Sequence, residues 1–154
     1  MGLICGVIGP LFVKCLEFVD LVFAAIPKIP GWAKPALGGL IVGGIGYVYP
    51  EILGDGAGPM NLAIRGNAMG WELLIALALL KMAATSITLG SGASGGTFAP
   101  SLFIGAMAGG AYGVLMNAVF PGFTAGPGSY SLVGMAATAA AAAHAPMTMI
   151  VMLF

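Results

Sequence analysis

The stretch GSGASGGTFAPSLFIGA, residues 90–106, joins a glycine- and serine-rich turn to the start of an apolar helix. Pro100 suits the first turn of a helix, because the N–H that proline lacks would have no intrahelical partner there. The glycines before it let the backbone bend freely. We therefore expect a helix over residues 98–120 whose N-terminus lies close to Phe98.

The chain around this stretch is too apolar to form a water-exposed surface. Of its 154 residues, 60% are hydrophobic and 6% charged, whereas an ordinary soluble domain carries about 25% charged residues. No Asp, Glu, Lys or Arg occurs from Met82 to Phe154, and one membrane-crossing helix needs about 20 apolar residues. The composition predicts an all-α, multi-pass membrane protein, with residues 1–154 forming part of one transmembrane domain and no separate soluble domain. The formal net charge is zero, so no basic field is present to attract nucleic acid.

Several of the expected helices are short or interrupted by glycine and proline. Irregular backbone at membrane depth is tolerated only where protein buries it or a water-filled cavity accepts it. Broken helices that meet near the midplane are a recurring feature of transporters. We therefore predict a bundle of short, tilted and broken helices. In chain order we expect helices over 2–26, 36–50, 59–65, 71–89, 98–120, 130–143 and from 146 onward, with turns over 27–35 and 121–128.

A few polar side chains lie within or beside the expected helices. An intramembrane lysine such as Lys81 by default suggests a site, but its long stem also lets it pair with a backbone carbonyl, and we favour this structural role. Lys14, Glu17 and Asp20 are spaced three apart, so they share a helix face that we expect at the membrane edge or against protein. His144 has no neighbouring acid or thiol, and we expect it at a helix end.

Enzymatic motifs are absent from the sequence. Gly90, Gly92 and Gly95 satisfy G-x-G-x-x-G, but a dinucleotide site also needs a preceding strand and a later acidic residue. An apolar helical run precedes these glycines, and no Asp or Glu follows them. Cys5 and Cys15 have neither CxxC nor zinc-type spacing. The sequence predicts that the protein is not an enzyme and holds no cofactor and no metal.

The expected helix start near Phe98 predicts an anion site instead. The first N–H groups of a helix lack intrahelical partners, and the aligned peptide dipoles place about half a positive charge at that end. Such an end attracts anions, and it holds them weakly enough for them to leave, as conduction requires. Glycines also serve helix packing, and Gly105, Gly109 and Gly113 form a face of small residues that lets two helices approach.

The residues Gly96-Thr97-Phe98-Ala99-Pro100 match G-x-F-x-P, the anion-site motif of the CLC family of chloride channels and proton-coupled chloride exchangers. The sequence resembles this family along essentially the whole chain. The resemblance implies chloride transport of the voltage-gated channel or antiporter type, with the anion bound at these five residues by the backbone amides of Thr97 and Phe98. It also implies a homodimer in a lipid bilayer, here a bacterial inner membrane, with chloride or similar anions as the only ligand.

Other motifs of the family have no match in the chain. These are G-S-G-x-P, the G-x-E-G-P motif with its gating glutamate, and a later tyrosine that contacts the ion. The resemblance therefore implies most of the second of two inverted repeats, about half of a CLC-type fold, which we expect not to conduct chloride alone. It leaves channel and exchanger undistinguished, and the few positive charges leave the membrane orientation open. The alternatives are a broken-helix transporter for another small solute, a non-transporting membrane assembly module and, more remotely, a soluble nucleotide-binding enzyme.

Overall fold

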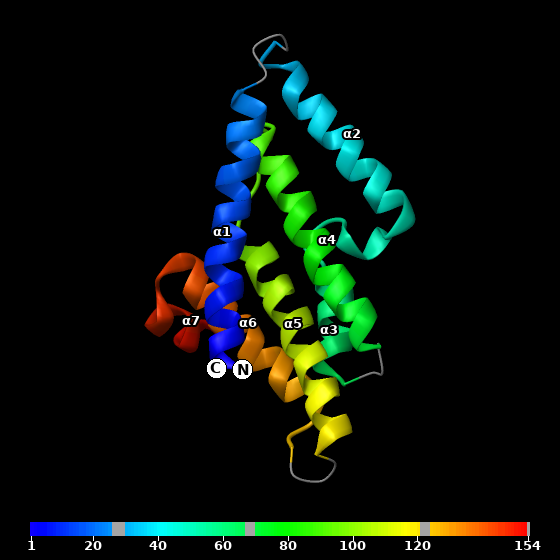
Figure 1. The fold of residues 1–154 in the computed structure, drawn as a ribbon, viewed down its shortest axis with the longest axis vertical. Helices are drawn as coiled ribbons and strands as arrows, with labels where there is room; N and C mark the ends of the chain where they lie inside the picture. Colours follow the sequence, from blue (N-terminus) through cyan, green and yellow to red (C-terminus); the bar gives the residue numbers. More distant parts are fainter. Residues whose placement is uncertain (26–29, 67–69, 121–123, 154) are drawn as a thin grey trace.

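A computed structural model describes residues 1–25, 30–66, 70–120 and 124–153 of the chain (Figure 1). Over these residues the chain forms helices joined by turns, with no strand. This confirms the all-α class that the sequence predicts. The elements are α1 (Gly2–Ala24), α2 (Ala33–Val48), the 3-10 helix η1 (Pro50–Ile52), α3 (Ala57–Ile64), α4 (Trp71–Gly90), α5 (Phe98–Val119), α6 (Pro127–Ala143) and α7 (Pro146–Leu153).

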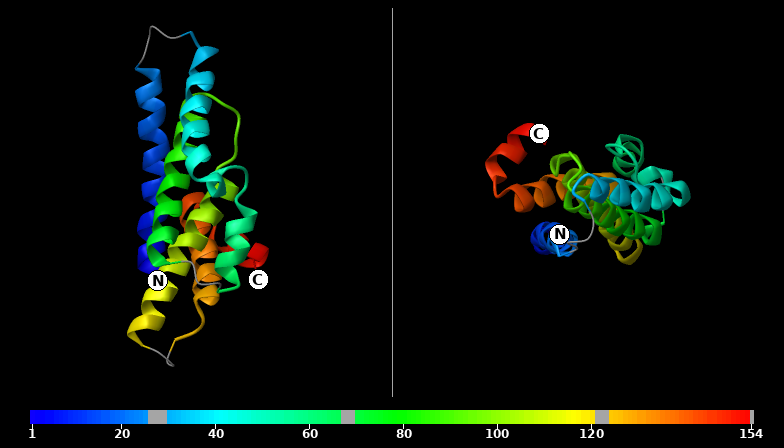
Figure 2. Two further views of the ribbon diagram at one scale, coloured as in Figure 1. Left: turned by 90° about the vertical axis from the view of Figure 1, so that its right-hand side faces the viewer. Right: turned by 90° about the horizontal axis from the view of Figure 1, so that it is seen from above.

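Three of the described helices, α1, α4 and α5, are long and apolar enough to cross a membrane, judged by length and composition. They run along the long axis of the molecule, as the two perpendicular views in Figure 2 show. The apolar helix α2 has only 16 residues, which gives a length of about 24 Å at 1.5 Å per residue. The mixture of spanning and short helices matches the predicted bundle.

Helix α5 begins part of the way along the long axis of the bundle. Helix α4 ends near the top of the molecule in Figure 1, and residues 91–97 then run back along the long axis before α5 starts near the middle. The same connection is visible beside the bundle in the left view of Figure 2. The junction of α6 and α7 lies at a similar height in Figure 1. The predicted broken helices therefore meet part of the way along the bundle.

Three predicted helix starts are wrong, each at or near a proline. The sequence predicts a turn at Pro35, but α2 begins at Ala33 and takes Pro35 into its first turn, where the missing N–H costs nothing. Helix α3 begins at Ala57, two residues before the predicted start at Pro59. Likewise α6 begins at Pro127, three residues before the predicted start. The predicted turns over 27–35 and 121–128 lie partly outside the described residues.

The most extensive helix contact is the seam between α5 and α6. A Cβ atom added to Gly105 would meet the carbonyl oxygen of Gly134, and one added to Gly134 would meet the carbonyl oxygen of Gly105. Farther along α5, a Cβ on Gly109 would meet the carbonyl oxygen of Tyr130. Only glycine permits this approach, because backbone atoms cannot move aside as a flexible side chain does. The predicted packing role of these small residues is confirmed.

Candidate anion site

The N-terminus of α5 forms without a side-chain cap. Thr97 precedes the helix, and its hydroxyl makes no capping hydrogen bond. Its carbonyl accepts a hydrogen bond from the amide of Ser101 at 3.1 Å. The Ser101 hydroxyl donates to the carbonyl of Phe98 at 2.7 Å, so it does not cap the amides either. The first helical residue is Phe98, as predicted, and Pro100 lies in the first turn.

The first amides of α5 are consequently free. Those of Thr97, Phe98 and Ala99 form no hydrogen bond with any residue that the structure describes. A helix has four such donors at its start, and water, a capping side chain or a ligand must satisfy them. With the helix dipole behind them, these N–H groups make a small region of positive potential that no charged side chain supplies.

Two hollows flank this segment. The hollow that we call the α4 hollow has a volume of about 230 Å³ and is lined by Gly95, Gly96 and Pro100 together with residues of α4 and of the turn after η1. The α1 hollow has a volume of about 330 Å³ and is lined by Thr97 and Phe98. Its other lining residues come from α1, α5 and the end of α6: Phe12, Val13, Leu16, Ser101, Ala142 and Ala143.

The five residues predicted from the sequence are therefore neighbours around one helix start, but they face different spaces. Gly96, Thr97 and Phe98 are exposed, and Ala99 and Pro100 are half-buried. Ala99 lines neither hollow. Their role in anion binding stays a prediction. Among the residues that the structure describes, no acidic or basic side chain lines the α1 hollow.

Sequence reasoning missed the other walls of both hollows. Phe12 and Ala142, which line the α1 hollow with Phe98, are far from it along the chain. No motif identifies them, since only the packing of α1 and α6 against α5 brings them there. Thr85 and Thr88 also line the α4 hollow. The sequence does not predict this role, because isolated threonines in an apolar run match no binding motif.

The remaining polar residues lie at a helix end and along α1. His144 follows α6 directly as an exposed residue in the left-handed conformation, with φ of 54°, which confirms a helix-end residue. Lys14, Glu17 and Asp20 are all exposed along α1. Within the described part of the chain, no group of three or more His, Cys, Asp or Glu residues could hold a metal ion.

Lys81 is engaged with the backbone. Its Nζ donates to the carbonyls of Ile52 and Gly54, both at 2.6 Å, and only 3% of the residue is exposed. The structural role favoured from the sequence is therefore supported, with partners that the sequence did not identify.

The fold thus defines a multi-pass helical membrane protein in which one helix starts part of the way along the bundle with free amides (Figure 1). Comparison with known proteins assigns the family. All residues from 1 to 154 match the family model described as voltage gated chloride channel. The chain belongs to this family, the CLC family that the sequence resembles.

Individual relatives agree with the family match. The chain is 39% identical over its whole length to a putative chloride channel protein, ClcB-like, of Ralstonia nicotianae, and covers 35% of that protein. It is 36% identical, over 99% of its length, to the H(+)/Cl(-) exchange transporter ClcA of Cronobacter sakazakii, and covers 33% of it. The chloride channel protein CLC-e of Arabidopsis thaliana is 35% identical, with 24% of its length covered. The chain spans about a third or less of the curated relatives it matches.

Proposed function

We propose that the chain forms part of a chloride-transporting membrane protein, and that the start of α5 holds the anion. In this proposal the amides of Thr97 and Phe98 donate hydrogen bonds to chloride, while Gly96, Ala99 and Pro100 shape the backbone around it. The observation that carries the proposal is the set of free amides at a helix start beside a hollow with no charged lining residue. Membership of the voltage gated chloride channel family supports it.

The chemistry of this site suits an ion that must both bind and leave. A hydrogen bond to a charged partner contributes about 1.5–3 kcal/mol, so two amides replace part of the hydration that chloride loses. The low dielectric of a protein interior strengthens these interactions relative to water. A buried lysine or arginine would hold the anion more tightly, and conduction requires release. Backbone amides therefore bind the anion selectively and still allow it to dissociate.

The whole-protein properties are part of the same proposal. Residues 1–154 are taken as part of one CLC-type transmembrane domain that acts as a homodimer in a bacterial inner membrane, without enzymatic activity and without a cofactor. Bacterial relatives support this location. The relatives include both a putative chloride channel and an exchanger, so the proposal covers both the channel and the antiporter mode of transport.

The test is anion flux in proteoliposomes that contain the complete protein. We expect saturable chloride efflux that bromide and nitrate inhibit competitively, because a site made of amides recognises small anions in general. Liposomes with residues 1–154 alone are the matched control, and we expect no selective flux from them.

Three outcomes would overturn parts of this proposal. Flux that is indifferent to chloride, bromide and nitrate would support a transporter for another solute. Complete absence of flux from a folded, correctly inserted protein would favour the non-transporting assembly module. Selective, saturable flux from residues 1–154 alone would contradict the expectation that the chain is incomplete as a pathway.

A further inference from the structure

The turn between η1 and α3 is held from two sides by residues far away in the sequence. From α4, Lys81 donates to the carbonyls of Ile52 and Gly54. From α5, the ring of Phe103 packs so close to Gly56 that a Cβ atom there would collide with it. Gly56 also has a φ of 76°, which disfavours other residues. The turn is therefore shaped by its glycines and fixed by α4 and α5.

The two carbonyls depend on Lys81. Neither the carbonyl of Ile52 nor that of Gly54 accepts a backbone hydrogen bond from the residues that the structure describes. Ile52 is itself buried, with 3% exposure, and a buried carbonyl without a donor is costly. Lys81 satisfies both with hydrogen bonds that are stronger because the donor is charged.

The turn that Lys81 holds is also a wall of the α4 hollow. Ile52, Leu53 and Gly54 line this hollow together with Gly96 and Pro100 of the G-x-F-x-P segment. A shift of the turn would therefore change the width of the space beside the proposed anion site. Lys81 lines the same hollow, so it is placed to control that width.

We propose that Lys81 is a positioning residue for anion transport: its amine clamps the carbonyls of Ile52 and Gly54 and thereby fixes the wall of the α4 hollow. This inference rests on the proposed function. In this role Lys81 acts through hydrogen bonds to the backbone and is not a ligand of the anion. Two of its donors are occupied by carbonyls, and its Nζ lies 5.2 Å from the centroid of the Phe103 ring, an arrangement that also stabilises a cation.

Three substitutions of Lys81 distinguish the effect of its hydrogen bonds from the effect of its positive charge. Lys81→Met keeps a similar side-chain length and loses both the charge and the donors, whereas Lys81→Gln loses the charge and keeps N–H donors. Lys81→Arg keeps both. If the hydrogen bonds to the carbonyls are what matters, Lys81→Gln and Lys81→Arg keep part of the order of the turn and of the chloride affinity that Lys81→Met loses. If the positive charge is what matters, only Lys81→Arg keeps the order of the turn and the chloride affinity.

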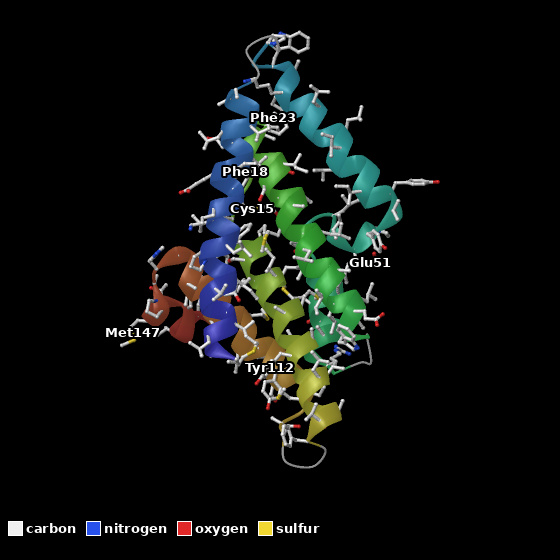
Figure 3. The ribbon with its side chains drawn as sticks, viewed as in Figure 1. Cys15, Phe18, Phe23, Glu51, Tyr112 and Met147 are labelled. Carbon is white, nitrogen blue, oxygen red and sulfur yellow. The ribbon has the colours of Figure 1, made fainter. Side chains whose placement is uncertain are left out.

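The first readout measures the clamp without any flux. Glu51 is exposed on η1 (Figure 3), so a spin label attached at Glu51→Cys reports the mobility of the turn. The complete protein is used, with Cys5 and Cys15 replaced by alanine. We expect Lys81→Met to increase the mobility of the label and Lys81→Gln to restore much of the order. An unchanged spectrum in Lys81→Met would overturn the clamp, whether or not the protein transports chloride.

The second readout is chloride flux by the same variants. Because small displacements at a site can cost one to two orders of magnitude, we expect Lys81→Met to raise KM for chloride about tenfold, with a smaller change in maximum rate. Met82→Leu, a buried neighbour on α4 outside the α4 hollow, is the control and should leave both unchanged. If Lys81→Met makes the label more mobile but leaves KM for chloride unchanged, the positioning role is overturned. If Lys81→Met and Lys81→Gln have equal KM values although the label is ordered in Lys81→Gln, the effect on KM is due to the charge of Lys81, which also overturns the positioning role. If wild-type protein shows no flux, the proposed function fails while the label still tests the clamp.

Discussion

Exchanging the amide of Phe98 for an ester is expected to weaken chloride binding by about tenfold to a hundredfold. The α-hydroxy analogue of phenylalanine, incorporated at this position, replaces the N–H by an oxygen and keeps the ring. It removes one hydrogen bond to a charged partner, which is worth about 1.5–3 kcal/mol. The Phe98 amide itself has no partner among the described residues, so the helix is affected only through the Thr97 carbonyl, which as an ester accepts the Ser101 amide more weakly. Chloride binding is measured by titration calorimetry on the complete protein.

Side-chain variants are the matched controls for this substitution. Phe98→Leu and Thr97→Ala alter the side chains and keep both amides, so we expect changes in affinity of less than about threefold, below the value of one hydrogen bond. An ester at Thr97 should act like the ester at Phe98. Equal affinities for the Phe98 ester and the wild-type protein would show that this amide does not bind the anion.

Substitution of Gly105 by alanine is expected to lower the free energy of unfolding by about 2 kcal/mol, which is typical of overpacking in a close-packed interior. The added Cβ would meet the carbonyl oxygen of Gly134 across the seam, so α5 and α6 must move apart. Alanine otherwise favours a helix over glycine by up to about 1 kcal/mol, which opposes the loss. Unfolding is followed by circular dichroism during titration with a denaturing detergent.

Gly43→Ala on α2 is the matched control for the seam. In the part of the chain that the structure describes, nothing lies within 4 Å of a Cβ atom at this position. We expect its stability to be unchanged or raised by up to about 1 kcal/mol, because only the helix preference of alanine acts. Equal stability of the Gly105→Ala and Gly43→Ala proteins would contradict the close seam between α5 and α6.

Local sequence signals predicted the helices and the start of α5. Pro100 and the glycines before it marked the helix N-terminus at Phe98, because both residue types act on the backbone at their own position. The long apolar runs identified α1, α4 and α5, because a helix that crosses a membrane needs about 20 apolar residues. The same kind of signal misplaced the starts of α2, α3 and α6, since a proline fits both a turn and the first turn of a helix.

Contacts across the chain could not be predicted in this way. Lys81 was identified as an unusual residue from its position alone, but its acceptors lie 27 and 29 residues away. Gly105 was identified as a packing residue, yet its partner Gly134 becomes known only when α5 and α6 are placed side by side. The residues that line the two hollows around Phe98 depend on packing in the same way.

The central claim is that the amides at the start of α5 bind the transported anion. Anomalous scattering from bromide, in crystals of the complete protein soaked in or grown from bromide, tests it most directly. We predict a peak within hydrogen-bonding distance of the amides of Thr97 and Phe98, which chloride displaces in competition. A well-ordered α5 start with no bromide peak beside these two amides, at a concentration that saturates transport, would contradict the claim.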